Sequence, residues 1–341
     1  SQMAGLTVQN FVSAATGLAV LVALCRGIGR KSTKTLGNFW VDMTRATLYG
    51  LLPLCLVLAL FLVWQGVPQT FAHYVDAVTM QGVDQVIPLG PAASQIAIKQ
   101  LGTNGGGFFG VNSAHPFEDP TAWANLFEVA SIILIPAALV FTFGHYVKDL
   151  RQSRAILGCM LALFLIGGAT SLWSEYQPNP TLNNPAVEQT APLEGKEARF
   201  GTTGTVLWSV TTTAASNGSV NGMQDSLSPL SGMVALVNMM VGEVIFGGVG
   251  AGMYGMLLNV LIAVFLAGLM IGRTPEYLGK KLQAKEVQLL VVTLLVMPVG
   301  VLVLSAIAAS LPGPASAISN PGPHGFSQLL YAYTSAGANN G

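Results

Sequence analysis

Apolar segments alternate with polar connections along the whole chain, and several of these segments are long enough to cross a bilayer. A transmembrane helix needs about 20 predominantly apolar residues. The sequence therefore predicts spans at residues 4–25, 46–64, 126–147, 155–173, 232–271 and 287–311. Glycine and proline occur inside some of them, which membrane helices tolerate. The pattern predicts an all-α polytopic membrane protein.

Lysine and arginine concentrate in alternate connections between these spans. Of the 15 basic residues, 12 follow the first, third and fifth spans: Arg26, Arg30, Lys31, Lys34, Arg45, Lys148, Arg151, Arg154, Arg273, Lys280, Lys281 and Lys285. Only Lys99, Lys196 and Arg199 lie in the other connections. Because basic loops stay on the cytoplasmic side, the bias predicts which connections face the cytoplasm.

The connections on the other side are long, at about 66–125 and 174–231, and a third begins near 312. Each contains an apolar run too short to span but suited to a re-entrant helix, at about 92–102, 204–215 and 325–337. A turn of small, polar residues ending in glycine follows each run. The turns are Thr103, Asn104, Gly105; Ser216, Asn217, Gly218; and Asn339, Asn340, Gly341.

Such turns suit a site for a dehydrated monovalent cation. Glycine adopts backbone conformations closed to other residues, so several carbonyl oxygens can face one point. A cage of oxygens can replace the water around the ion, and the negative end of the preceding helix dipole points the same way. A flexible surface loop is the alternative for any one turn. Recurrence argues against it, because Gly105, Gly218 and Gly341 lie 113 and 123 residues apart.

The repeating unit is thus a span, an external loop, a half-helix, a glycine turn and a second span. Irregular backbone at membrane depth is tolerated only when it is buried or lines a wet cavity, so the turns should converge. We divide the chain into residues 1–35, 36–153, 154–284 and 285–341. The first part corresponds to the inner helix of one repeat, then come two full repeats and the start of a fourth. We therefore expect a fragment of a protein with four such units.

Composition limits the remaining functions. The chain is 52% hydrophobic and 9% charged, with a mean hydropathy of +0.58, whereas soluble domains carry about 25% charged residues. Zero net charge argues against nucleic-acid binding. The three cysteines show no pairing pattern and the four histidines no metal-ligand spacing. No phosphate-binding or phosphorylation motif is present, so we expect no ATP hydrolysis by this chain and no organic cofactor.

Several strings resemble the potassium-translocating A subunit of the bacterial Kdp P-type ATPase, a relative of potassium channels and Trk/Ktr transporters. They are Ser1 to Asn10 (SQMAGLTVQN), Leu101 to Phe109 (LGTNGGGFF), Glu194 to Glu197 (EGKE), Gly272 to Lys281 (GRTPEYLGKK) and Asn320 to Phe326 (NPGPHGF). The resemblance covers the whole chain. It implies four membrane–pore–membrane repeats around a pseudo-fourfold filter, with K⁺ bound by the nine turn residues named above. Asn217 stands where some relatives have a cysteine, which argues against a role for its side chain and leaves a role for its carbonyl open.

The same resemblance implies an ATP-driven K⁺ uptake complex in the bacterial cytoplasmic (inner) membrane. The filter would face outside, and K⁺ would pass through an intramembrane tunnel to a P-type ATPase subunit. Smaller C and regulatory subunits and membrane lipid would be the further partners. The alternative is a self-contained potassium channel or secondary transporter of the Trk/Ktr type, for which the filter physics would be the same.

A glycine-rich stretch interrupts the fifth span at 246–255, with Gly247, Gly248, Gly250, Gly252 and Gly255. Each glycine weakens a helix by roughly 1 kcal/mol relative to alanine. Close helix packing is one interpretation. The resemblance favours the other, a broken inner helix that crosses beneath the filter and gates it. The string GAGMYG also fits a dinucleotide-binding motif, but no βαβ pattern surrounds it.

Acidic residues within otherwise apolar runs are the last candidates. An acid at membrane depth costs a few kcal/mol and usually faces a cavity or a partner. Glu243 is therefore assigned a structural or ion-path role. Glu128 is either a second such acid or a residue near the membrane interface. Arg273, at the cytoplasmic end of the broken span, is either a topology anchor or a gating contact.

Overall fold

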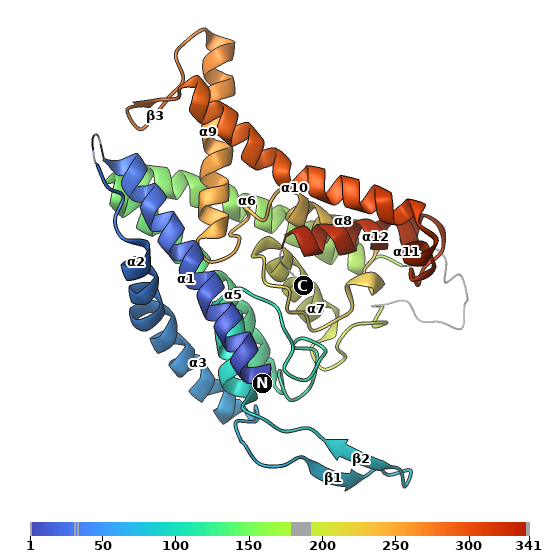
Figure 1. Cartoon of the computed structure of the whole chain (residues 1–341). Helices are drawn as coiled ribbons and strands as arrows, with labels where there is room; N and C mark the ends of the chain where they lie inside the picture. Colours follow the sequence, from blue (N-terminus) through green and yellow to red (C-terminus); the bar gives the residue numbers. More distant parts are fainter. Residues whose placement is uncertain (1, 31, 33, 179–191, 339–341) are drawn as a thin grey trace.

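The computed structural model describes residues 2–30, 32, 34–178 and 192–338, and most of this length is helical (Figure 1). Among these residues, six helical segments are long and apolar enough to cross a membrane. They are α1 (Gln2–Gly29); α2 (Phe39–Arg45) continuing through a π-helical stretch (Ala46–Leu51) into α3 (Leu52–Gln65); α5 (Ala122–Val147); α6 (Leu150–Glu175); α9 (Ala251–Ile271); and α10 (Ala284–Ser310). The predicted all-α polytopic fold is confirmed.

Three shorter helices match the predicted re-entrant runs. They are α4 (Ala92–Leu101), α7 (Gly201–Ala214) and α12 (Gly322–Gly337). The residues that end them, Gly102, Ala215 and Ala338, each lie three positions before the predicted glycine of the turn. The structure therefore repeats in the register that the sequence predicts.

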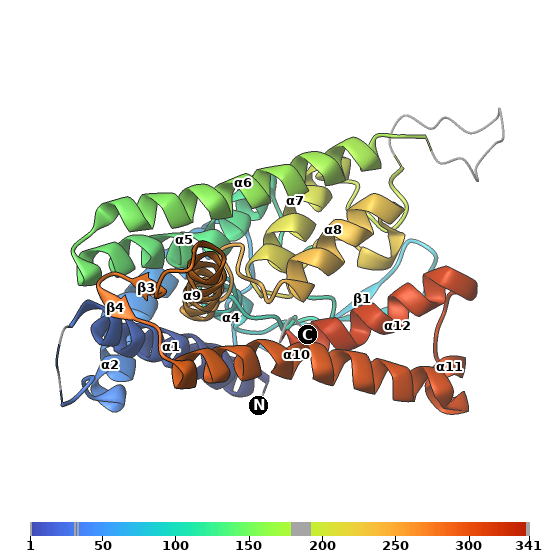
Figure 2. The same ribbon diagram turned by 90° about the horizontal axis from the view of Figure 1, so that it is seen from above.

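The three half-helices are held by different neighbours. Helix α4 packs against α1, α3 and α5; α7 packs against α5, α6 and α8 (Pro229–Met240); α12 packs against α10 and α8. Figure 2 shows α7 and α8 between α6 on one side and α10 with α12 on the other. The main apolar core joins α1, α3, α4 and α5 and includes Leu21, Leu62, Ile96 and Phe143, all fully buried. Helix α4 is thus enclosed by membrane-length helices.

Local sequence signals fix where several of the helices begin. Asn38, Thr121 and Asp149 each accept hydrogen bonds from main-chain N–H groups in the first turns of α2, α5 and α6. Helix α10 begins with a reciprocal capping box between Gln283 and Glu286. Such caps satisfy N–H groups that have no partner within the helix.

Small hairpins lie at opposite ends of the molecule (Figure 1). Strands β1 (Val75–Val78) and β2 (Asp84–Ile87) pair after α3. Strands β3 (Glu276–Tyr277) and β4 (Lys280–Lys281) pair between α9 and α10. In the second hairpin, Lys280 contacts the main-chain oxygen of Gly27 in α1, and the Tyr277 hydroxyl donates to Gln152 in α6 over 3.5 Å. The lysine- and arginine-rich connections therefore meet at one end.

The fifth predicted span is shorter than expected. The sequence predicted one apolar segment over 232–271, broken at 246–255, whereas α8 ends at Met240 and α9 begins at Ala251. The break therefore lies at 241–250, and Gly252 and Gly255 belong to α9. The prediction from glycine positions placed the break too far along the chain. Glu243 and Phe246, which are not glycines, adopt left-handed conformations in the break, with φ of 52° and 68°. The remaining helices are α11 (Pro312–Ser316) and the 3₁₀ turn Gln224–Ser226.

Candidate functional site

The turns after α4 and α7 share one backbone arrangement. We call residues 102–107 the second-repeat turn and residues 215–219 the third-repeat turn. The N–H of Asn104 donates to the carbonyl of Lys99, and the N–H of Asn217 donates to the carbonyl of Thr212, both over 3.1 Å. This bond spanning five residues is the helix-terminating bond of a Schellman motif. The two half-helices therefore end in the same way, although their sequences differ.

A left-handed residue that is not glycine stands at the same position of both turns. Thr103 has a φ of 49° and Ser216 a φ of 56°. This conformation is unusual for a β-branched residue such as threonine. Strained backbone of this kind persists only where the surroundings enforce it, and it clusters at functional sites. The next residue with a positive φ is Gly106 in the second-repeat turn and Gly218 in the third-repeat turn. Gly105 and Gly218 each follow the asparagine of their turn, but they therefore differ in backbone conformation.

Main-chain oxygens in the middle of each turn accept no hydrogen bond from any residue that the structure describes. Between described residues, none is made to the carbonyl oxygens of Thr103, Asn104 and Gly105, or to those of Ser216 and Asn217. The flanking carbonyls are engaged: Gly102 accepts from the Asn104 side chain, Gly106 from Gln95 and Gly218 from Asn112. Thr103, Asn104 and Asn217 are buried, and buried carbonyls normally have partners. Carbonyl oxygens of this kind can act as ligands for a dehydrated cation.

The break between α8 and α9 lies against both turns. The N–H of Gly247 donates to the carbonyl of Ala214 over 2.9 Å, and the N–H of Val249 donates to the Thr103 hydroxyl over 2.8 Å. A β-carbon at Gly248 would lie 3.5 Å from the Thr103 hydroxyl oxygen and 3.6 Å from the β-carbon of Ser216. Backbone from the break therefore passes beside the left-handed residue of each turn.

Glycines at the end of the break and at the start of α9 also allow close packing. A β-carbon on Gly250 would lie 2.2 Å from the main-chain carbonyl atoms of Gly17 in α1, and one on Gly252 would lie 2.0 Å from the carbonyl oxygen of Phe246. No side chain fits at such distances. The helix is therefore broken, and its backbone also packs closely against α1. The gating role of the glycine stretch stays a prediction.

The second-repeat turn is supported by a charged cluster. Lys99, in α4, forms a 2.8 Å ion pair with Glu118 and donates to the Ser113 hydroxyl over 2.7 Å, with both charged side chains fully buried. Glu118 also accepts from the main-chain N–H groups of Phe109 and Ser113. Burial by itself would raise the pKa of Glu118, but Lys99 and these N–H groups hold the pKa below its usual value. The loop after the turn is thus fastened to its own half-helix.

Neutral groups support the third-repeat turn. The indole N–H of Trp208 donates to the carbonyl of Ser219 over 2.8 Å, and the N–H of Ser219 donates to the Asn217 side chain over 2.8 Å. The Ser216 hydroxyl donates to the carbonyl of Ala338 over 2.9 Å, so this turn contacts the end of α12. The second-repeat turn, the third-repeat turn and the C-terminal end of α12 therefore lie close together.

The predicted site residues fall into four groups. Thr103, Asn104, Ser216 and Asn217 lie in the two turns, with Gly105 and Gly218 beside them. Glu243 lies in the break, 6% exposed, while Arg273 is exposed beyond the far end of α9 and is not brought to the turns. Asn339, Asn340 and Gly341 lie outside the described residues. The Gly250–Gly255 string follows irregular backbone rather than a strand, so the structure gives the dinucleotide interpretation no support.

Sequence reasoning missed the polar residues behind the turns. Gln95, Lys99 and Gln100 are all fully buried in α4. Their presence in a run predicted to re-enter the membrane was the available signal, because buried polar groups need partners. Glu128 is likewise fully buried and accepts from Gln100 over 2.7 Å, so it lies behind the turn.

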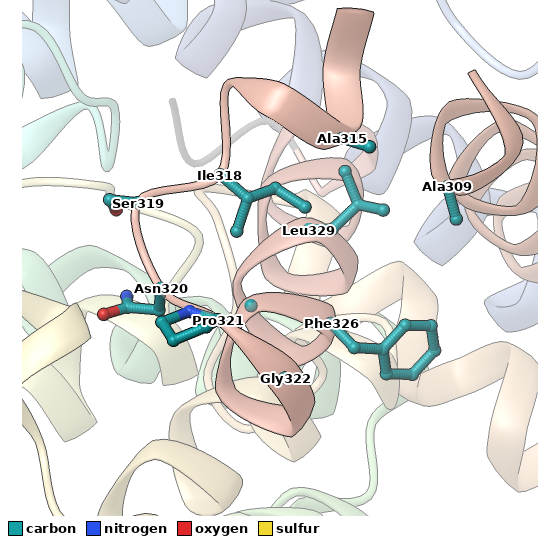
Figure 3. A pocket seen from close by; sticks show the side chains of 10 residues that line it. Ala309, Ala315, Ile318, Ser319, Asn320, Pro321, Gly322, Phe326 and Leu329 are labelled. Atoms are coloured by element: carbon teal, nitrogen blue, oxygen red, sulfur yellow. The ribbon is translucent and has the colours of Figure 1, made fainter. Parts of the chain in front are cut away.

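A cavity of about 430 Å³ lies apart from the turns, at the start of α12 (Figure 3). Its polar side chains are already used: Gln328 donates to Ser319 over 2.8 Å, and Asn320 donates to Asp225 over 2.8 Å. Apolar groups from Ile318, Phe326 and Leu329 also line it. The arrangement shapes the entry into α12, and its side chains form no constellation for binding a cation.

Comparison with known proteins assigns the chain as a whole. The family described as "Potassium-transporting ATPase A subunit" matches residues 1–341. Similar curated proteins carry the name potassium-transporting ATPase potassium-binding subunit. They include those of Pseudomonas fluorescens SBW25 (97% identical), Pseudomonas aeruginosa PAO1 (81%) and Rhodospirillum centenum (59%). Each alignment covers the whole chain, and the chain spans 60% of the length of these relatives.

Proposed function

The chain belongs to the family of potassium-transporting ATPase A subunits, and on this premise we propose that its turns bind and select K⁺. The single observation that carries the proposal is the run of free carbonyl oxygens at Thr103, Asn104 and Gly105, matched at Ser216 and Asn217. These oxygens replace the water around K⁺. The C-terminal ends of α4 and α7 add the negative ends of their dipoles. Asn339, Asn340 and Gly341, outside the described residues, are the corresponding K⁺ ligands of the fourth repeat by their place in the repeated sequence pattern.

The protein is a subunit of an ATP-driven K⁺ uptake complex in the bacterial cytoplasmic membrane. The turns face outside, opposite the lysine- and arginine-rich connections. A P-type ATPase subunit hydrolyses ATP, and K⁺ passes to that subunit from this chain within the membrane. Smaller C and regulatory subunits complete the complex. The chain itself supplies no residues for hydrolysis. The names of the relatives, which include the word ATPase, favour this over a self-contained Trk/Ktr-type channel or transporter.

The break at 241–250 prevents a straight passage to the cytoplasm. Its backbone contacts both turns, through Gly247 and Val249, and is fixed to α1 through Gly250 and Gly17. An ion that leaves the turns is therefore diverted sideways. This diversion allows hydrolysis in the partner to drive uptake without a leak.

The filter assignment is tested with Gly218→Asp in the full-length complex. Gly218 has a φ of 84°, so any side chain there is strained and displaces the adjacent carbonyls. We expect the K⁺ concentration for half-maximal ATPase stimulation to rise at least tenfold and discrimination against Rb⁺ and Na⁺ to fall. Gly82→Asp, in the β1–β2 hairpin, is the control, because its φ is 78° and nothing lies near its β-carbon position. Unchanged K⁺ affinity and discrimination in Gly218→Asp would refute the filter.

The blocked path is tested with Gly250→Ala. The added carbon would overlap the backbone of Gly17, so the break must move away from α1. We expect either a passive K⁺ conductance in liposomes or ATP hydrolysis uncoupled from uptake, with K⁺ binding retained. Gly82→Ala again controls for left-handed strain alone. A tight, fully coupled Gly250→Ala complex would reduce the glycine stretch to close packing.

A further inference from the structure

Gln100 is a buried side chain that contacts two repeats at once. It lies near the end of α4 and is fully buried. Its carbonyl oxygen accepts from the hydroxyl of Ser219 in the third-repeat turn over 2.9 Å. Its amide nitrogen donates to Glu128 of α5 over 2.7 Å and to Ser113 over 3.1 Å. One side chain therefore spans from the second-repeat half-helix to the third-repeat turn.

The partners of Gln100 fix the orientation of its amide. A glutamine side chain offers one acceptor oxygen and one donor nitrogen. The nitrogen of the Gln100 amide faces a side-chain oxygen of Glu128 over 2.7 Å. The oxygen then faces Ser219. Gln100 thus contacts Glu128 with one end of its amide and the third-repeat turn with the other.

Ser219 connects this bond to a residue whose free carbonyl is part of the turn. The Ser219 side chain contacts the Asn217 side-chain oxygen, and the Ser219 N–H donates to the same oxygen over 2.8 Å. A change at Gln100 therefore acts on Asn217 through a single intervening side chain. A second connection runs in parallel, since Asn112 donates to the carbonyl of Gly218 over 2.9 Å.

From this network we infer that Gln100 is a positioning residue that sets the spacing between the second- and third-repeat turns and thereby tunes ion selectivity. The inference rests on the proposed K⁺ site and adds a determinant of its specificity. A cage formed from separate turns discriminates between ions only if the distance between the turns is held. Gln100 holds it from behind and does not touch the ion.

The test measures ion discrimination in the full-length complex, as the ratio of half-maximal concentrations for K⁺ and Rb⁺ in ATPase stimulation. Gln100→Leu removes both ends of the link, and Ser219→Ala removes only one oxygen. We expect each to reduce discrimination about fivefold, the effect of losing one ordinary hydrogen bond. The double variant should lose no more than either single one, because both remove the same link.

Ser171→Ala is the matched control, because the Ser171 side chain is fully buried in α6 and its hydroxyl has no partner among the described residues. We expect its discrimination to match wild type. A merely structural role for Gln100 would lower stability or maximal rate and leave the ion ratio unchanged. If Gln100→Leu does not accumulate, Ser219→Ala carries the test alone.

Three outcomes overturn the inference. Wild-type discrimination in Ser219→Ala, or additive losses in the double variant, would refute it while Gly218→Asp still shows the filter defect. Wild-type discrimination in Gly218→Asp as well would instead remove the proposed K⁺ site, and this inference with it. The two failures are therefore distinguishable.

Discussion

The second- and third-repeat turns have the same helix-terminating bond and the same left-handed residue, yet they are supported by opposite chemistry. Behind the second-repeat turn lies a buried ion pair between Lys99 and Glu118. Behind the third-repeat turn lies the uncharged indole of Trp208, which donates to the carbonyl of Ser219 in that turn. The backbone arrangement of a turn is thus independent of the type of group that fixes it.

The hydroxyl groups of the left-handed residues in the two turns also form hydrogen bonds with different parts of the chain. Thr103 accepts from Val249 and so contacts the break beneath the turn. Ser216 donates to Ala338 and so contacts the next repeat. A repeat that looks symmetrical along the sequence is therefore asymmetrical in its contacts. Each turn is adapted to the neighbour that its position provides.

This difference predicts unequal sensitivity to substitution, and the largest effect is expected for Lys99→Met. The variant leaves Glu118 buried without its ion-pair partner. Breaking such a pair costs about 3–5 kcal/mol of folding free energy, because an uncompensated charge stays buried. Thermal unfolding of the full-length protein in detergent measures it. Adding Glu118→Gln should recover much of the loss, and Arg199→Met, from a partly exposed pair, should cost under about 1 kcal/mol. A Lys99→Met protein as stable as the double variant would contradict the charged support.

A smaller loss is expected for Trp208→Phe in the third-repeat turn. The substitution removes the donor to the carbonyl of Ser219, and a buried acceptor left unsatisfied costs about 1–3 kcal/mol. The same thermal measurement applies, and K⁺ affinity should fall with stability. Trp123→Phe is the control, since Trp123 is 62% exposed. Equal losses for Lys99→Met and Trp208→Phe would remove the distinction between the two supports.

The smallest effect concerns Asp119, beside the charged cluster. Burial raises the pKa of Asp119 to about 7, although a hydrogen bond from Asn125 opposes the shift. The folded state then holds a proton that the unfolded state releases near pH 4. The stability from this group is therefore complete below about pH 4 and declines as pH rises through 7. Between pH 6 and 7.5 we expect a loss of about 1 kcal/mol, absent in Asp119→Asn. A wild-type thermal midpoint that falls no more than that of Asp119→Asn over this range would contradict the shift.

Much of the fold was available from local patterns. The six spans, the three half-helices and the position of each turn after its half-helix followed from apolar run length and from the recurrence of hydroxyl, amide and glycine residues. These features depend on neighbours in sequence and on the thickness of a bilayer. The break was placed five residues too late, because Glu243 and Phe246 adopt conformations that composition does not predict.

By itself, the sequence determined the membrane-spanning architecture, the repeat and the residues of the turns, because each is encoded within one short segment. Only the tertiary structure decided what holds the turns and what lies beneath them. The partners of Gln100 lie 13, 28 and 119 residues away, and Thr103 meets Val249 at a separation of 146. Contacts over such separations depend on how whole helices pack, since a buried polar residue signals that it needs a partner but not which one it will find.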